Sequence, residues 1–120
     1  MGYNNNNNSF KGGNYMLLHS NQENFNNDVI NSNKLVLVDF FATWCGPCQM
    51  LAPVLENLSN TDTSIDIVKI DIDSDRDLAI QYNIEAVPTL VLFKNGNELD
   101  RTMGFLDKND LINFINKNKE

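Results

Sequence analysis

Several residue types that define whole classes of protein are scarce in this sequence of 120 residues. Its 9 Lys and Arg residues are outnumbered by 16 Asp and Glu residues, which gives a formal net charge of −7. Nucleic-acid-binding proteins usually carry a basic patch, and none is present, so we expect no nucleic-acid partner. There are only two cysteines and one histidine, His19. A structural zinc site would need two further ligands beside the cysteines, so we expect no metal.

Long apolar runs are also missing. The longest, Leu35 to Val38, is far too short to cross a bilayer, and the N-terminal residues lack the apolar core of a signal peptide. A transit peptide is not expected, because the first arginine is Arg76. We therefore expect a cytoplasmic protein without a membrane segment. In that compartment a cysteine pair is more often catalytic or metal-binding than a structural bridge.

The length and the hydrophobic fraction of 42% predict a single domain with one core. Residues 1–14 contain a run of asparagines and a Gly12-Gly13 pair, with almost no side chains to bury. Such a segment cannot offset the entropy cost of ordering, so we expect a disordered Asn-rich tail. The folded domain is expected to span residues 15–120.

Both cysteines lie where a buried strand should give way to a helix. The apolar run 35–41 predicts the strand and is broken by one acid, Asp39, whereas apolar residues at helical spacing between Met50 and Leu58 predict the helix. An Asn-Gly pair at 95–96 predicts a hairpin. The remaining expected strands are 15–19, 65–71, 89–93 and 99–103, and the remaining expected helices are 23–31, 75–82 and 107–118. The order βαβαβ then ββα predicts an α/β fold, with a mixed sheet of about five strands and four helices on its two faces.

Cys45 and Cys48 are three residues apart, so on a helix they share one face and can form a disulfide with each other. A crosslink that closes so small a loop adds little stability, which favours a redox role over a structural one. A cysteine at a helix N-terminus meets unpaired N–H groups and the positive end of the helix dipole, and both lower its pKa. We therefore expect Cys45 to be the attacking thiol and Cys48 the resolving thiol. Inert core thiols are the alternative interpretation.

The segment Val38-Asp39-Phe40, followed by Trp44-Cys45-Gly46-Pro47-Cys48, resembles the thioredoxin family. The resemblance continues, in the family's order, over residues 15–120. The further matching positions are Pro53, Lys69, Val87-Pro88-Thr89, Phe93-Lys94-Asn95-Gly96 and Gly104. Two positions depart from the common pattern: Phe41 stands where many members have tryptophan, and Gln49 stands where they usually have a basic residue.

This resemblance implies the thioredoxin fold and a protein-disulfide reductase that contributes to cell redox homeostasis. It also implies that Asp39 lies beneath the cysteines near Lys69 and transfers protons to and from Cys48, although an acid facing solvent at a strand end is the alternative. Gly46, Pro47 and Lys69 would tune the redox pair. The residues expected to form the apolar substrate-docking surface, with Pro88 in a cis peptide bond, are Trp44, Val87, Pro88, Met103 and Gly104.

The resemblance further implies a monomer that binds no cofactor and receives electrons from NADPH through thioredoxin reductase. Its clients would be disulfide-containing proteins such as peroxiredoxins. A specialised or organelle-targeted thioredoxin is one alternative. A binding subunit that holds a client on the same apolar surface, without turnover, is an alternative from another functional class. His19 has no supporting spacing for catalysis, and we interpret it as incidental.

Overall fold

The computed structural model describes residues 16–119. The predicted tail over 1–14 and the first residue of the predicted first strand lie outside the described residues. The elements, in chain order, are β1 (Met16–His19), η1 (Asn26–Ile30), β2 (Leu35–Phe41), α1 (Gly46–Thr61), β3 (Ile65–Asp71), α2 (Arg76–Gln81), β4 (Thr89–Lys94), β5 (Asn97–Met103) and α3 (Lys108–Asn116). The predicted order of strands and helices is confirmed.

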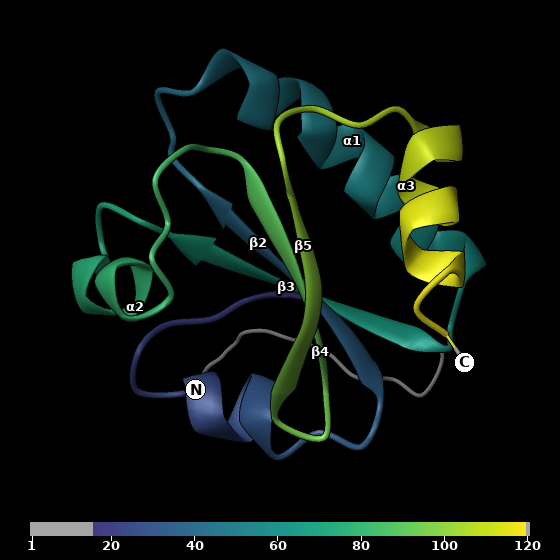
Figure 1. Ribbon diagram of the computed structural model, residues 1–120. Coiled ribbons are helices and arrows are strands. Elements are labelled where there is room, and N and C mark those ends of the chain that lie inside the picture. Colours follow the sequence, from purple (N-terminus) through teal and green to yellow (C-terminus); the bar gives the residue numbers. More distant parts are fainter. Residues whose placement is uncertain (1–15, 120) are drawn as a thin grey trace.

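The strands form one mixed five-stranded sheet with the order β1-β3-β2-β4-β5 (Figure 1). Strands β1, β3 and β2 run parallel, whereas β4 is antiparallel to both β2 and β5. Parallel neighbours need crossover connections, which α1 and the η1 segment supply, and antiparallel neighbours accept a tight hairpin. The predicted mixed sheet is confirmed.

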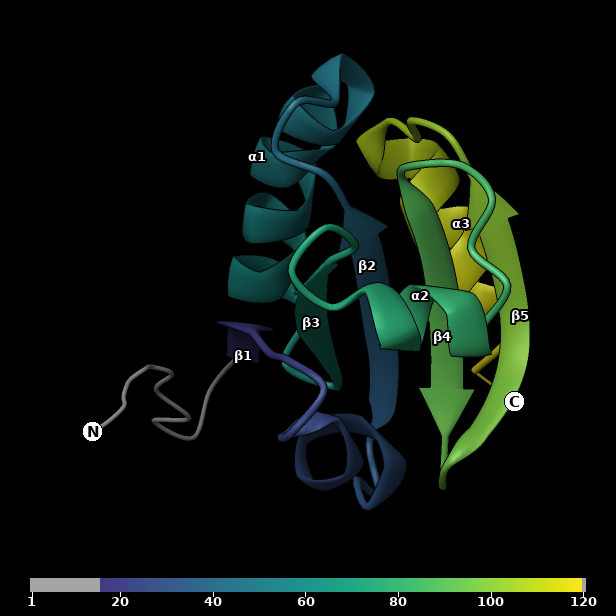
Figure 2. The same ribbon diagram turned by 90° about the vertical axis from the view of Figure 1, so that its left-hand side faces the viewer.

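Alternation along the strands gives the sheet a core on each face (Figure 2). In β2, Leu35 and Leu37 point toward α1 and α3, whereas Val36 and Val38 point toward η1 and α2. All four side chains are buried because helices cover both faces. Asp39 continues the row that begins with Leu35 and Leu37, so its carboxyl group lies on the α1 side of the sheet.

The first predicted helix, over 23–31, is wrong in type and length. The structure has a single π-helical turn, in which the Asn31 N–H donates to the Asn26 carbonyl oxygen at 2.8 Å. Asparagine is a weak helix former, so this asparagine-rich segment gains little from a longer α-helix. Burial of Phe25 and Val29 against the sheet holds the turn in place. With α1, α2 and α3, it accounts for the four predicted helices.

Strand β5 begins two residues earlier than predicted. The chain reverses through Asn95 and Gly96 alone, with φ angles of 52° and 82°. Positive φ at both central residues is typical of the two-residue turn that matches the twist of a hairpin. The longer β5 pairs with β4 along its length, apart from a register shift between Leu92 and Phe93. This hairpin brings the end of β5 to the end of the sheet where α1 begins (Figure 1), and Met103, the last residue of β5, pairs there with Thr89.

Candidate active site

The connection from β2 to α1 carries both cysteines, and Cys45 and Cys48 form a disulfide with a Cα–Cα distance of 5.2 Å. Cys45 is the N-cap of α1, and Gly46 and Pro47 open the helix. Proline is well tolerated there because the first N–H groups of a helix have no partner within the helix. The predicted strand–turn–helix placement of the cysteines is confirmed.

The N-terminus of α1 directs one backbone N–H group at Cys45 Sγ. The Cys48 backbone N–H donates to Cys45 Sγ at 3.1 Å, so the Cys45 side chain caps the helix. Cys45 Sγ also lies 3.6 Å from the Val87 carbonyl oxygen. Both cysteines are buried, at 5% and 4% exposure. In the reduced protein, the same N–H group and the helix dipole would favour a thiolate at Cys45.

The residues expected to dock substrate are grouped around Cys45. The Val87-Pro88 peptide bond is cis. The Gly104 N–H donates to the Pro88 carbonyl oxygen at 2.8 Å, which joins the end of β5 to the start of β4. Trp44 and Met103 are the exposed members, at 68% and 62% exposure.

Asp73 is a residue of this region that sequence reasoning did not identify. Its carboxylate accepts a hydrogen bond from Trp44 Nε1 at 2.8 Å, which fixes the indole ring although the ring is exposed. The two residues are 29 positions apart, and only the crossover from β2 to β3 brings them together. No local pattern in the sequence signals such a contact.

Asp39 is fully buried and paired with Lys69, so the alternative of a solvent-facing acid is wrong. Lys69 Nζ donates to Asp39 Oδ2 at 3.1 Å. The other carboxyl oxygen, Oδ1, has no hydrogen-bond partner among the described residues. Burial raises the pKa of Asp39, and Lys69 opposes that rise by its charge and its hydrogen bond.

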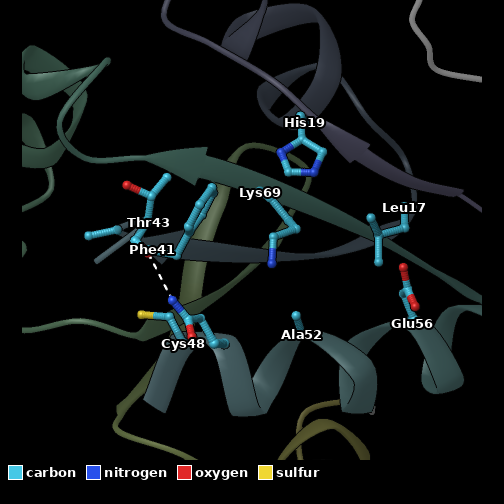
Figure 3. A pocket seen from close by; sticks show the side chains of 10 residues that line it. Leu17, His19, Phe41, Thr43, Cys48, Ala52, Glu56 and Lys69 are labelled. Atoms are coloured by element: carbon cyan, nitrogen blue, oxygen red, sulfur yellow. Dashed lines mark hydrogen bonds between the residues drawn. The ribbon is translucent and has the colours of Figure 1, made fainter. Parts of the chain in front are cut away.

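A pocket of about 320 Å³ opens on the α1 side of the sheet, next to Cys48 (Figure 3). Lys69 Nζ lies 4.7 Å from the centre of the Phe41 ring, and the His19 ring meets the same ring edge-on at 6.0 Å. Burial and the nearby Lys69 lower the pKa of His19, whereas Asp71 opposes that shift. The pocket is lined by Leu17, His19, Phe41, Ala42, Thr43, Cys48, Gln49, Ala52, Glu56 and Lys69.

The two departures from the family pattern both lie in this pocket. Gln49 Nε2 donates to the Thr43 carbonyl oxygen at 3.0 Å and thus braces the turn before the cysteines. Phe41 presents its ring face to Lys69, a cation–π contact that a tryptophan would also allow. Neither residue replaces a group that reacts.

Within residues 16–119, no three His, Cys, Asp or Glu side chains are arranged to hold a metal ion. None of the described helices is long and apolar enough to cross a membrane.

One family model covers almost all of the described chain: the thioredoxin model matches residues 16–117. The chain belongs to the thioredoxin family. The thioredoxin of Chlamydia trachomatis is 49% identical over 98 residues, which cover 82% of this chain and 94% of that protein. The thioredoxin of Rickettsia bellii is 41% identical over 95 residues, which cover 78% of this chain and 90% of that protein.

A solved thioredoxin has the same fold. The crystal structure of Malassezia sympodialis thioredoxin superimposes with a TM-score of 0.76 at 36% identity, covering 87% of this chain and 90% of that one. Membership of the thioredoxin family, together with a cysteine pair at disulfide distance, identifies the chain as a protein-disulfide oxidoreductase that performs dithiol–disulfide exchange. Members of this family normally bind no cofactor, and their partners are redox proteins such as reductases and disulfide-containing clients.

Proposed function

We propose that Cys45 is the nucleophile and Cys48 the resolving thiol of this thioredoxin. The Cys45 thiolate attacks one sulfur of a substrate disulfide, forms a mixed disulfide and releases the other substrate sulfur as a thiolate. Cys48 then attacks Cys45 Sγ, so the Cys45–Cys48 disulfide forms and the second substrate sulfur leaves. The observation that supports these roles is the Cys48 N–H that donates to Cys45 Sγ at the start of α1. That donor favours a thiolate at Cys45. It belongs to Cys48, which lies in the first turn of α1.

Asp39 is proposed to take the proton from Cys48 before Cys48 attacks. Its carboxyl group is buried on the α1 side of the sheet, and Oδ1 is without a partner among the described residues. Lys69 holds the other oxygen. A carboxyl group whose pKa is raised by burial is better matched to a thiol than an exposed one, because general base efficiency improves as the two pKa values approach each other. Lys69, Gly46 and Pro47 are proposed to tune the redox pair.

Substrate is proposed to dock on the apolar surface around Cys45. An extended substrate segment would pair with the backbone of Val87, a sequence-tolerant mode of recognition because main-chain groups carry it. The supporting observation is that Cys45 Sγ lies beside the Val87 carbonyl oxygen, with Trp44 and Met103 exposed near it. Pro88 is itself buried, and its carbonyl oxygen accepts from the Gly104 N–H, so these two residues are proposed to hold the backbone in place at this surface.

The oxidised protein is proposed to be reduced by a thioredoxin reductase that draws electrons from NADPH. The sequence Gly46-Pro47 between the cysteines resembles that of reducing family members, which favours this direction over disulfide formation. Disulfide-containing proteins such as peroxiredoxins are the proposed clients. We also propose that the protein is monomeric and cytoplasmic. Gel filtration tests the oligomeric state, and cell fractionation tests the location.

The decisive experiment is reduction of insulin by a small dithiol, with the natural chain, Cys45→Ser and Cys48→Ser compared. We expect activity in the natural chain alone, because each variant lacks one half of the exchange. Cys48→Ser should accumulate a mixed disulfide through Cys45, seen by non-reducing electrophoresis. A mixed disulfide that accumulates in Cys45→Ser instead would reverse the two roles. No activity in the natural chain would favour the client-binding alternative.

A further inference from the structure

Three titratable side chains form one row across the sheet beneath α1. In the register of β1 and β3, His19 lies opposite Lys69, and in the register of β3 and β2, Lys69 lies opposite Asp39. Residues opposite each other in neighbouring strands have side chains on the same face. The row therefore runs from the buried carboxyl group of Asp39 to the exposed edge strand that carries His19.

The pocket beside α1 links the outer part of this row to the redox centre (Figure 3). Cys48, Lys69 and His19 all line it, and Lys69 reaches Asp39 from it by its hydrogen bond. A volume of about 320 Å³ is enough for several water molecules, each of which takes up about 30 Å³ in the liquid. Asp39 itself does not line the pocket, so a hydrated route from the surface reaches Lys69 Nζ, which is one hydrogen bond away from Asp39 Oδ2.

The inference rests on the proposed role of Asp39 as proton acceptor. In each turnover the Cys48 proton moves to Asp39, and because Asp39 is fully buried, that proton must leave before the carboxylate can act again. The Lys69 ammonium group has donors and no acceptor, so it cannot receive the proton. An imidazole has both a donor and an acceptor, so it can take a proton on one nitrogen and release one from the other.

We propose that His19 exchanges protons between Asp39 and the solvent through this pocket. During substrate reduction, the proton passes from Cys48 Sγ to Asp39, from Asp39 through water to the His19 imidazole, and from there to bulk water. The electrons remain on sulfur: the Cys45–Cys48 bond forms as the bond between Cys45 and the substrate breaks. Reduction of the disulfide by the reductase returns a proton along the same route.

Burial first, and the charge of Lys69 second, favour the neutral, proton-accepting form of His19. Lys69 and Asp71 face it from β3, and Glu56 lines the same pocket from α1. Burial and Lys69 lower the pKa of His19, and Asp71 only partly opposes them. Phe41, the last residue of β2, contributes no charge, and its ring meets the imidazole edge-on.

The test uses an aromatic disulfide whose thiol is coloured when released, mixed with the pre-reduced protein in weak buffer. The first release reports attack by Cys45, and the second reports attack by Cys48. The variant His19→Gln removes the titrating group. In buffer at about pH 6, near the ordinary pKa of imidazole, we expect His19→Gln to show an unchanged first release. Its second release should be slowed about tenfold relative to the natural chain. The difference should shrink as the pH rises, because a larger fraction of Asp39 then starts the reaction ionised.

Chemical rescue separates proton exchange from a structural role. Added imidazole is small enough for the pocket and should restore the second release in His19→Gln without changing the natural chain. A bulky base of similar pKa should not restore it. Glu56→Gln is the matched control, since it also replaces a titratable side chain of the pocket with a neutral amide, and it should leave the second release unchanged.

Three results would overturn the proposal: equal second releases in the natural chain and His19→Gln, a slowed release that imidazole does not restore, or an equal slowing in Glu56→Gln. Urea unfolding of each variant checks that the fold is intact. An absent first release in the natural chain would instead contradict the proposed function, so the two failures are distinguishable.

Discussion

A single buried acid shows how sequence and sheet register combine at this site. Asp39 breaks an apolar strand, and that interruption alone indicated a residue with a role. Its partner could not be identified from the local pattern, because Lys69 is 30 residues away and only the parallel pairing of β2 with β3 brings them together. The expectation that they meet came from the family resemblance. The register also places His19 beside Lys69, a neighbour that its position in the sequence does not suggest.

Replacing Asp39 with asparagine should stabilise the fold at neutral pH and slow turnover. Because burial raises the folded-state pKa, protonated Asp39 contributes its full stability below the unfolded value of 3.8. That contribution falls as the pH rises and is lost once the pH passes the raised folded pKa. Asparagine carries no charge to desolvate, so we expect a gain on the order of 1–3 kcal/mol at neutral pH. Urea unfolding measured across a range of pH should show the gain vanish in acid.

Asp66→Asn provides the control for this prediction. Asp66 lies on the neighbouring strand and pairs with Lys34 at 2.7 Å, and the lysine side chain is 42% exposed. Loss of this partly exposed pair should cost about 1 kcal/mol or less and should not stabilise the protein at any pH. If Asp39→Asn were less stable than the natural chain at neutral pH, the hydrogen bond to Lys69 would outweigh the cost of burying the charge.

At the scale of elements, strands were easier to predict than helices. The buried strands are short, apolar and rich in β-branched residues, so their positions in the sequence were predicted to within a few residues. The predicted limits of α3 were too wide at both ends: Asp107 is the N-cap and accepts from the Asp110 N–H, so the helix begins at Lys108, and it ends at Asn116. The π-helical turn at η1 was not predictable, since it depends on how Phe25 and Val29 fit the sheet.

The β4–β5 hairpin gives an element-scale prediction. Gly96 has a φ of +82°, and a Cβ added there would lie 3.1 Å from the Ile30 carbonyl oxygen and 3.3 Å from Ile30 Cγ2. Gly96→Ala therefore combines backbone strain with a close contact against η1, and we expect it to cost about 1–3 kcal/mol in urea unfolding. Disulfide exchange by the folded protein should be unchanged, because the turn follows Lys94, which pairs with the start of β2, whereas the cysteines follow the end of β2.

Gly104→Ala separates the two causes. Gly104 also has a positive φ, of +92°, but nothing lies within 4 Å of an added Cβ. It should cost only the backbone strain, about 1 kcal/mol. Equal losses in the two variants would show that Ile30 moves aside readily and that the turn's contact with η1 contributes little.

At the scale of the whole molecule, the redox site depends on both cores at once. One core packs α1 and α3 on the sheet, and the other packs η1 and α2 on its opposite face. The cysteines, with Ala42, form a small third cluster after the end of β2. Phe41, Ile72 and Val87 pack against it. Apart from η1, the fold was predictable because the apolar runs of the strands and the helical spacing of the apolar residues agree with it. The contacts inside the site were not, since they join segments that are distant in the sequence.

The boundary proposed for the thioredoxin domain gives the last prediction. The family model begins at residue 16, and the described elements begin with β1 at the same residue. A chain of residues 15–120 should therefore keep both the unfolding free energy and the rate of insulin reduction of the full chain. A chain that begins at residue 20 removes β1 as well. It loses the buried Leu18 side chain and uncovers one edge of β3, and we expect a loss of about 2–5 kcal/mol, the range for removing a core leucine. Urea unfolding of the three chains tests the boundary: a loss already present in the 15–120 chain would place part of the folding unit before residue 15.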